Sequence, residues 1–312
     1  MHTSSLPRPT AGHVLAWAQL LRPANVATAM ADVLAGAAVA GSTLPLAPAV
    51  HWLLVATACL YAGGIVLNDV FDRALDATER PERPIPSGRI SAGAAGLAGA
   101  GLSLAGIAAA TQAGTTAALV AVAIVAAVLS YDTWGKHHPF LGPVNMGLCR
   151  ALNLMLGVAV TPAALAAAWP LGLLPLTYIA AVTMVSRGEV HGAKRPVLMA
   201  AMGLVSAVVL SLTGLVVVRA MSDLAAGAFT PWHHAWSLAL AAWLAWRLLP
   251  ALVRAAATQA PGDVRHAVRT GVLSLVLLNA VIAASYAGII YSLAVLASGL
   301  LALALARLFA VT

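Results

Sequence analysis

The sequence predicts an all-α membrane protein with nine, or ten, transmembrane helices. Of its 312 residues, 61% are hydrophobic and only 9% are charged, far below the roughly 25% charged residues of soluble domains. Apolar runs of about 20 residues, each long enough to cross a bilayer, recur along the whole chain. No stretch resembles a linker between domains. We therefore expect a mobile tail over residues 1–12 and a single membrane domain over residues 13–312.

The predicted spans follow one another with short polar connections. They cover about residues 23–41, 50–67, 92–110, 115–130, 141–161, 170–185, 197–218, 235–252 and 272–286. A last apolar run, residues 289–309, is either a tenth span or a continuation of the ninth. Small residues are abundant throughout the chain, as expected where membrane helices pack closely.

Basic residues are distributed unevenly over the connections. If the N-terminus is cytoplasmic, the even-numbered connections face the cytoplasm and carry nearly all connecting Lys and Arg residues, whereas the odd-numbered ones carry only Arg219. This bias is a strong orientation signal. It predicts a multi-pass protein of the cell inner membrane with its polar connections in the cytoplasm. The net charge of +7 is then a consequence of topology, and nucleic acid is not an expected partner.

Charge is concentrated in residues 68–91, between the second and third spans. Asp69, Asp72 and Asp76 are spaced three and four residues apart, which on a helix places them within an arc of about 60°, with Asn68 at its edge. Carboxylates on one face repel each other, and a bound cation would remove that cost. Oxygen ligands favour Mg²⁺, which usually brings a phosphate. The nearby basic partners for phosphate oxygens are Arg73, Arg80, Arg83 and Arg89. The alternative is a solvated loop whose charges pair with each other.

Further polar side chains lie in or beside other spans. Lys136, near Tyr131, is either a second cationic contact for a diphosphate or an interfacial anchor. Several polar residues inside spans should face the bundle interior and are functional candidates: Asn25, Asp32, Asn145, Arg150 and Asn153. Arg150 and Asp32 can alternatively pair with each other. In the glycine-rich connection after the sixth span, Glu189 and His191 are either metal ligands or general bases, or solvated groups.

The segment NDVFDRALD, followed by ERPERPIPSGRIS, resembles the first aspartate-rich motif of the UbiA superfamily of intramembrane prenyltransferases. The stretches LRPANVATAMADVLAG, YDTWGK and NMGLCRALNLMLG are similar to the same family. Within it, YDTWGKHHPFLGPVNMGLCRALN and SRGEVHG are most similar to the UbiA-like EboC branch. The resemblance implies nine helices around a central cavity open to lipid. It also implies transfer of a prenyl chain from a prenyl diphosphate to an aromatic or other lipid-soluble acceptor.

The resemblance also implies roles for individual residues. Mg²⁺ and diphosphate would be held by Asn68, Asp69, Asp72 and Asp76. The diphosphate charge would be neutralised by Arg73, Arg83 and Lys136. We further predict catalytic roles for Asp72, Asp76, Glu189 and His191, and substrate contacts from Asn25, Arg150 and Asn153. Expected partners are a prenyl diphosphate, a lipid-soluble acceptor and membrane lipid.

The connection after the sixth span departs from the family pattern. The family carries a second aspartate-rich motif there, whereas this chain reads SRGEVHGAKRP, without aspartate. Glu189 is the only carboxylate that can replace it as a Mg²⁺ ligand, because His is a poorer ligand for so hard an ion. The alternative function is therefore a non-catalytic protein of the same fold that binds or moves a lipid-soluble metabolite or prenyl-phosphate carrier.

Overall fold

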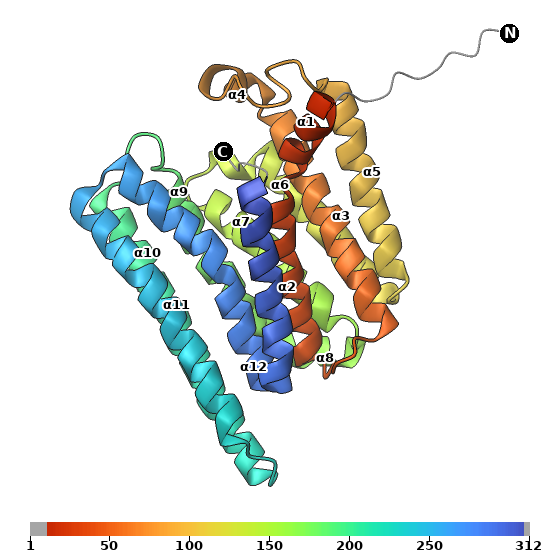
Figure 1. Cartoon of the computed structure of the whole chain (residues 1–312), viewed down its shortest axis with the longest axis vertical. Coiled ribbons are helices and arrows are strands. Elements are labelled where there is room, and N and C mark those ends of the chain that lie inside the picture. The colour runs from red at the N-terminus through yellow and green to blue at the C-terminus, as the bar shows by residue number, and fades with distance from the viewer. Residues whose placement is uncertain (1–10, 309–312) are drawn as a thin grey trace, which may run out of the picture.

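The computed structural model describes residues 11–308, which fold into helices joined by short connections (Figure 1). The first six helices are α1 (Ala11–Leu21), α2 (Pro23–Val39), α3 (Pro48–Phe71), α4 (Arg73–Glu79), α5 (Ala92–Thr111) and α6 (Thr115–Thr133). They are followed by α7 (Leu141–Val158), α8 (Pro162–Ala168), α9 (Leu173–Ser186), α10 (Arg195–Ala225), α11 (Pro231–Thr258) and α12 (Pro261–Leu308). Short 3₁₀ turns precede α7 and α9 at Gly135–His137 and Trp169–Gly172.

Proline marks the start of several helices. It lies in the first turn of α2, α3, α8, α10 and α11, where its missing N–H removes no helical hydrogen bond. Before α2, Arg22 adopts φ 45° and separates α2 from the short helix α1, which the hydropathy pattern does not predict. Residues 1–10 of the expected tail lie outside the described residues, and α1 begins at Ala11, two residues before the expected start of the domain.

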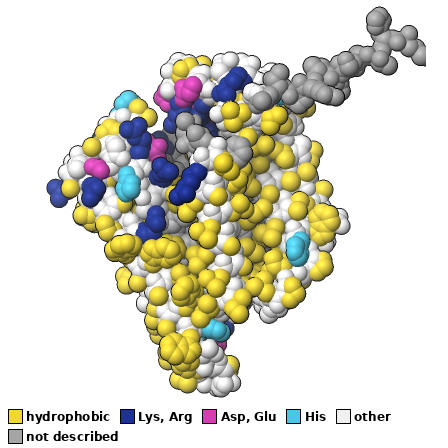
Figure 2. Space-filling model, viewed as in Figure 1, with side chains coloured by type: hydrophobic (Ala, Val, Ile, Leu, Met, Phe, Trp, Pro, Cys, Tyr) yellow, Lys and Arg dark blue, Asp and Glu magenta, His cyan; other side chains and the backbone are white. Residues whose placement is uncertain are grey.

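The structure is a multi-pass membrane bundle. Seven helical segments are long and apolar enough to cross a bilayer by length and composition, among the described residues. The two central helices α2 and α7 are shorter and carry polar residues, and 12 of the 17 residues of α2 are buried. The space-filling view shows a broad hydrophobic flank, with charged side chains gathered at the end that carries α4 and the α11–α12 connection (Figure 2).

Helix α12 consists of two segments that meet at Gly288. This glycine has φ 79° and ψ −174°, a conformation that only glycine adopts readily. The two segments then run in opposite directions (Figure 1), and a Cβ on Gly299 of the second would lie 2.9 Å from Val276 of the first. The last apolar run is therefore a separate antiparallel segment and not a straight continuation of the ninth span.

Helices α2 and α7 pack with their backbones in contact. A methyl group at Gly157 of α7 would overlap the Val33 carbonyl of α2, and one at Gly36 would overlap the Leu154 carbonyl. Such close approach is possible only because one residue of each contact is a glycine. They bring the polar residues of both helices together in the middle of the bundle.

We expect Gly157→Ala to destabilise the fold, because the added methyl group meets rigid backbone and must push α2 and α7 apart. Overpacking of this kind costs about 1–3 kcal/mol. Thermal unfolding of the purified protein in detergent measures the effect. Gly203→Ala is the matched control, since no atom lies within 4 Å of its added Cβ. Equal unfolding temperatures for the two variants would contradict this account of the helix pair.

Candidate functional site

The first aspartate-rich segment does not form one continuous helix. Helix α3 ends at Phe71, α4 begins at Arg73, and Asp72 between them has φ −85° and ψ 0°. The expectation of one continuous helix face is therefore wrong for Asp72, whereas Asp69 and Asp76 still face the same arginine, Arg83. The break lets the carboxylates turn towards two different groups of cations, which relieves the repulsion that a single face would impose.

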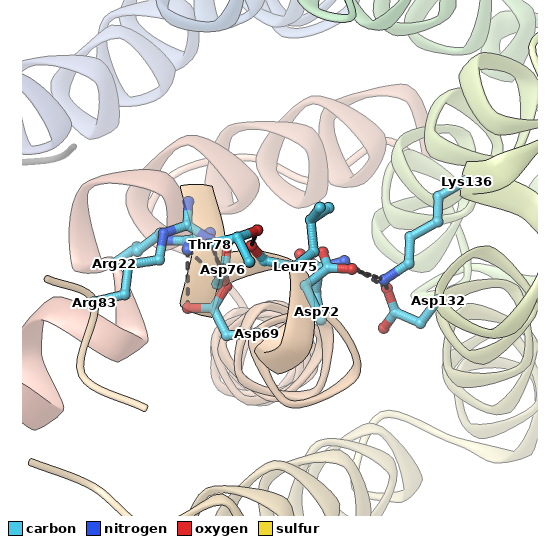
Figure 3. Close-up of polar contacts among 10 residues, drawn as sticks. Arg22, Asp69, Asp72, Leu75, Asp76, Thr78, Arg83, Asp132 and Lys136 are labelled. Carbon is cyan, nitrogen blue, oxygen red and sulfur yellow. Dashed lines mark hydrogen bonds and ion pairs between the residues drawn. The ribbon is translucent and has the colours of Figure 1, made fainter. Parts of the chain in front are cut away.

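Asp69 and Asp76 face two arginines from different parts of the chain (Figure 3). Arg22 donates from Nη2 to both carboxylate oxygens of Asp69, at 2.7 and 2.9 Å. Arg83 donates to Asp76 Oδ2 at 2.7 Å, and the same nitrogen lies 3.6 Å from Asp69 Oδ1. Both carboxylates are buried. Arg83 therefore bridges α3 and α4, as the rigid Arg-Pro-Ile-Pro turn after it allows.

Asp72 faces the second group of cations and acids (Figure 3). Lys136, in the connection between α6 and α7, places Nζ 2.5 Å from Asp72 and 3.9 Å from Asp132. Asn68 donates to Asp132 Oδ1 at 2.7 Å. The other oxygen of Asp132 is buried and has no hydrogen-bond partner among the described residues. Lys136 thus contacts the acidic segment, as its diphosphate-contact interpretation requires.

A cavity of about 310 Å³ lies beside these groups. Its polar end is formed by Arg22, Asn25, Asn68, Tyr131 and Asp132. Most of its wall is apolar, with side chains from α3, α6, α7, α9 and α12, including Leu60, Ile124, Met146, Ile179 and Val272. Because Arg22 and Asp132 belong both to the cavity wall and to the charged groups, the charged mouth and the apolar cavity are continuous.

A buried polar network lies deeper in the same cavity. Arg150 donates to Asp32 Oδ2 and to Thr28 Oγ1, each at 2.9 Å, and its guanidinium stacks over the Tyr61 ring at 4.8 Å. Asn153 donates to Asp32 Oδ2 at 2.9 Å, and Asn279 donates to Asp32 Oδ1 at 2.6 Å. Arg150 and Asp32 therefore pair with each other, and Arg150 and Asn153 also line the cavity.

The connection after α9 contributes to the same end of the bundle. Arg187 donates to the Lys136 carbonyl at 3.2 Å. Burial raises the pKa of Glu189, and the charges of Arg80 and Arg265 oppose that shift. His191 is exposed. The polar connections after α3, α6, α9 and α11 thus meet at one end, but neither Glu189 nor His191 contacts the aspartates of α3 and α4 among the described residues.

Some residues that the sequence predicts for the site lie away from it, and some residues of the site were not predicted. Arg73 is exposed and donates to the Val70 carbonyl, away from the carboxylates. The sequence pattern assigns no role to Arg22 or Asp132. The spacing of Asp132 four residues before Lys136 could have indicated that these two side chains lie close together. Asn279 lies 247 residues from Asp32, and no local pattern pointed to it.

Comparison with known proteins identifies the family. The model of the UbiA prenyltransferase family matches residues 29–262, about three quarters of the chain. The chain belongs to the UbiA prenyltransferase family. Its placement in the EboC branch stays a prediction.

Curated relatives of this UbiA-family chain match over short segments. A digeranylgeranylglyceryl phosphate synthase of Methanopyrus kandleri is 43% identical over 76 residues, 24% of this chain and 27% of the relative. The corresponding synthase of Methanothrix thermoacetophila is also 43% identical, over 24% of this chain and 28% of its own. The alignments thus span only about a quarter of each protein.

Solved structures share the UbiA-family fold over most of the chain. A structure described as giving insights into digeranylgeranylglyceryl phosphate synthase in membranes has a TM-score of 0.61 and 20% identity, covering 87% of this chain and 98% of its own. A UbiA homologue from Archaeoglobus fulgidus bound to DMAPP and Mg²⁺ has a TM-score of 0.57 and 15% identity, covering 81% and 98%. At these identities the likeness establishes the fold alone.

The donor set of this UbiA-family chain fits Mg²⁺. Three carboxylates and the amide of Asn68 supply only oxygen ligands at one end of the cavity, the chemistry that a hard divalent cation prefers. Each of Asp69, Asp72 and Asp76 is paired with Arg or Lys within the described residues. No compact group of three His, Cys, Asp or Glu residues exists within residues 11–308. Metal binding therefore requires these side chains to exchange partners.

Proposed function

We propose that this protein transfers a prenyl group from a prenyl diphosphate to a lipid-soluble acceptor inside the membrane, with Mg²⁺ as cofactor. The observation that carries the proposal is the continuity of a mouth of Asp, Arg and Lys side chains with an apolar cavity of about 310 Å³. The mouth suits a diphosphate and the cavity suits a hydrocarbon chain. Binding of DMAPP with Mg²⁺ by the Archaeoglobus fulgidus homologue supports this choice of donor.

The reaction breaks the bond between C1 of the prenyl group and the diphosphate oxygen, and the electron pair leaves with the diphosphate. A new bond forms between C1 and a nucleophilic atom of the acceptor, which loses a proton. Bound Mg²⁺ would supply positive charge to the leaving diphosphate and would be held by Asn68, Asp69, Asp72 and Asp76. Arg22, Arg83 and Lys136 are placed to neutralise the remaining charge once the diphosphate displaces them from the carboxylates.

The apolar wall protects the cationic character that develops at C1, because it excludes water from the prenyl chain. Asp132, with one carboxylate oxygen free of partners among the described residues and lining the cavity, can accept a hydrogen bond from the acceptor. Asn25 and Asn153 line the same cavity and remain predicted substrate contacts. Glu189 and His191 do not line it, and their catalytic roles stay predictions that need the connection after α9 to move inwards.

The proposal is tested with purified protein in detergent or nanodiscs. Labelled geranylgeranyl diphosphate is supplied with a panel of aromatic and lipid acceptors, including geranylgeranylglyceryl phosphate because of the relatives named above. We expect diphosphate release and a prenylated product that disappear with EDTA and return with Mg²⁺. Product formation that is unchanged by EDTA would contradict the assignment of the metal.

A non-catalytic carrier is the second candidate, and the arrangement of Glu189 favours it. This carboxylate is the only one in the loop that replaces the second aspartate-rich motif, and it makes no contact with the aspartates of α3 and α4 within the described residues; the nearby charges that act on it are those of Arg80 and Arg265. A carrier would bind prenyl diphosphate in a Mg²⁺-dependent way without forming product with any acceptor. Binding measured beside turnover in the same preparations separates the two functions.

We infer the cellular placement from charge. The four connections that meet at the site hold most of the basic residues, which supports a cytoplasmic site and a cytoplasmic N-terminus in the cell inner membrane. In this arrangement residues 13–312 act as one transferase domain, and water-soluble diphosphate enters and leaves on the cytoplasmic side.

A further inference from the structure

A second cavity lies between α11 and the two segments of α12, and Thr28 of α2, which accepts a hydrogen bond from Arg150, also lines it. It has a volume of about 320 Å³. Its walls are mainly Leu, Ala and Val side chains, and several of the large ones are exposed on the hydrophobic flank, namely Trp243, Leu293, Leu300 and Leu303. In a membrane this cavity therefore opens towards lipid. Residues Leu293 to Leu303 extend it over about 15 Å along the helix axis, the scale of part of an acyl chain.

Two polar side chains in this apolar cavity have no partner. Arg247 of α11 lines it, is exposed, and makes no ion pair or hydrogen bond within residues 11–308. Ser274 of α12 also lines it, is only 2% exposed, and its hydroxyl has no hydrogen-bond partner within the described residues. An arginine in a membrane-spanning helix is costly and is a functional-site candidate by default. A buried hydroxyl without a partner adds a donor for the same ligand.

The position of Arg247 along the helix suits a lipid head group. It lies about 16 Å from the end of α11 at Thr258, counted along the helix axis. Three more arginines, Arg254, Arg265 and Arg269, occupy the end of the α11–α12 pair beyond it, and Figure 2 shows basic side chains gathered on this part of the molecule. These residues place the polar surface of the bilayer just above the cavity. Of the four arginines, Arg247 lies farthest from this polar surface, and its long side chain can extend towards the surface so that the guanidinium reaches the level of the lipid phosphates.

From these observations we propose that the cavity between α11 and α12 binds one anionic membrane phospholipid. The phosphate accepts hydrogen bonds from Arg247 and from the Ser274 hydroxyl, and one acyl chain lies along the apolar wall between Trp243 and Leu303. A zwitterionic lipid is disfavoured because its positive head group is repelled by Arg247, the arginine that lines the cavity. Free phosphate is disfavoured because it leaves the apolar wall empty.

Native mass spectrometry of the purified protein in non-ionic detergent tests this proposal. We expect Arg247→Gln to bind the first phosphatidylglycerol molecule with at least fivefold weaker affinity than the unchanged protein. Ser274→Ala should weaken this affinity by a smaller factor. Arg254→Gln is the matched control, since this arginine is exposed on the same helix but outside the cavity. The affinity of this variant for phosphatidylglycerol should change less than twofold. Equal losses in Arg247→Gln and Arg254→Gln would show general electrostatic attraction and overturn the site.

The lipid class and the location are tested separately. Phosphatidylcholine with the same acyl chains should bind more weakly than phosphatidylglycerol and be less sensitive to Arg247→Gln, and inorganic phosphate should not displace the phospholipid. Equal binding of the two lipids, or displacement by inorganic phosphate, would overturn the proposal. Phosphatidylglycerol with brominated acyl chains should quench tryptophan fluorescence less in Trp243→Phe than in the unchanged protein. Unchanged quenching would place the lipid elsewhere. These readouts do not depend on prenyl transfer.

Discussion

Asp69→Asn lowers the rate of diphosphate release by about 10²- to 10³-fold, the size of loss expected when a group that stabilises charge in the transition state is removed. Asp69 is buried and holds Arg22 with both carboxylate oxygens, while Arg83 lies 3.6 Å away. An asparagine at this position keeps the shape of the side chain but loses the negative charge that would hold Mg²⁺. It also leaves the partly buried Arg22 and Arg83 with one carboxylate fewer between them. Single-turnover release of labelled diphosphate from geranylgeranyl diphosphate measures the effect.

Glu79→Gln provides the matched control for this experiment. Glu79 is an acidic residue of the same segment, at the end of α4, but it is exposed and makes no ion pair within residues 11–308. Its replacement removes the same charge without touching the cavity mouth, so diphosphate release should stay within about twofold of the unchanged protein. Similar rates in Asp69→Asn and in the control would remove the site from the proposed chemistry.

Arg150→Met produces the largest loss of stability that we expect. Asp32 is completely buried and accepts hydrogen bonds from Arg150, Asn153 and Asn279. Removing only the arginine leaves an uncompensated charge in the middle of the bundle. Breaking one partner of a buried ion pair costs about 3–5 kcal/mol. Unfolding of the purified protein, followed by circular dichroism during titration with sodium dodecyl sulfate, measures the free energy of unfolding.

A double variant and an exposed pair serve as controls for this prediction. Asp32→Leu together with Arg150→Met removes both charges, so the double variant should be more stable than Arg150→Met alone. Arg219 and Asp223 also form an ion pair, with side chains 31% and 26% exposed. Asp223→Asn keeps an oxygen that can still contact His234, 3.3 Å from Asp223, and should cost only about 1 kcal/mol or less. Equal costs for Arg150→Met and Asp223→Asn would show that burial does not govern the deep pair.

Much of this protein was predictable because its strongest signals are local. Apolar runs long enough to cross a bilayer predicted the helical membrane fold, since no other structure satisfies its backbone in lipid without closing a barrel. The acidic segment predicted the position of the charged mouth, where Lys136 pairs with Asp72, and the contact of Lys136 with a diphosphate stays a prediction. The break at Asp72 was not predicted, because residue spacing assumes a continuous helix and does not include the distant cations towards which the carboxylates turn.

The deep network shows the limit of local patterns most clearly. Each polar residue in a span could be assigned to the bundle interior, because burial in lipid would be costly, and the pairing of Arg150 with Asp32 was one of two expected outcomes. The contribution of Asn279, however, depends on α12 packing against α2 across 247 residues of chain. Composition and spacing thus determined the membrane bundle and its charged segment. Helix packing decided which cations meet which carboxylates, because those partners approach one another only when helices distant in sequence come into contact.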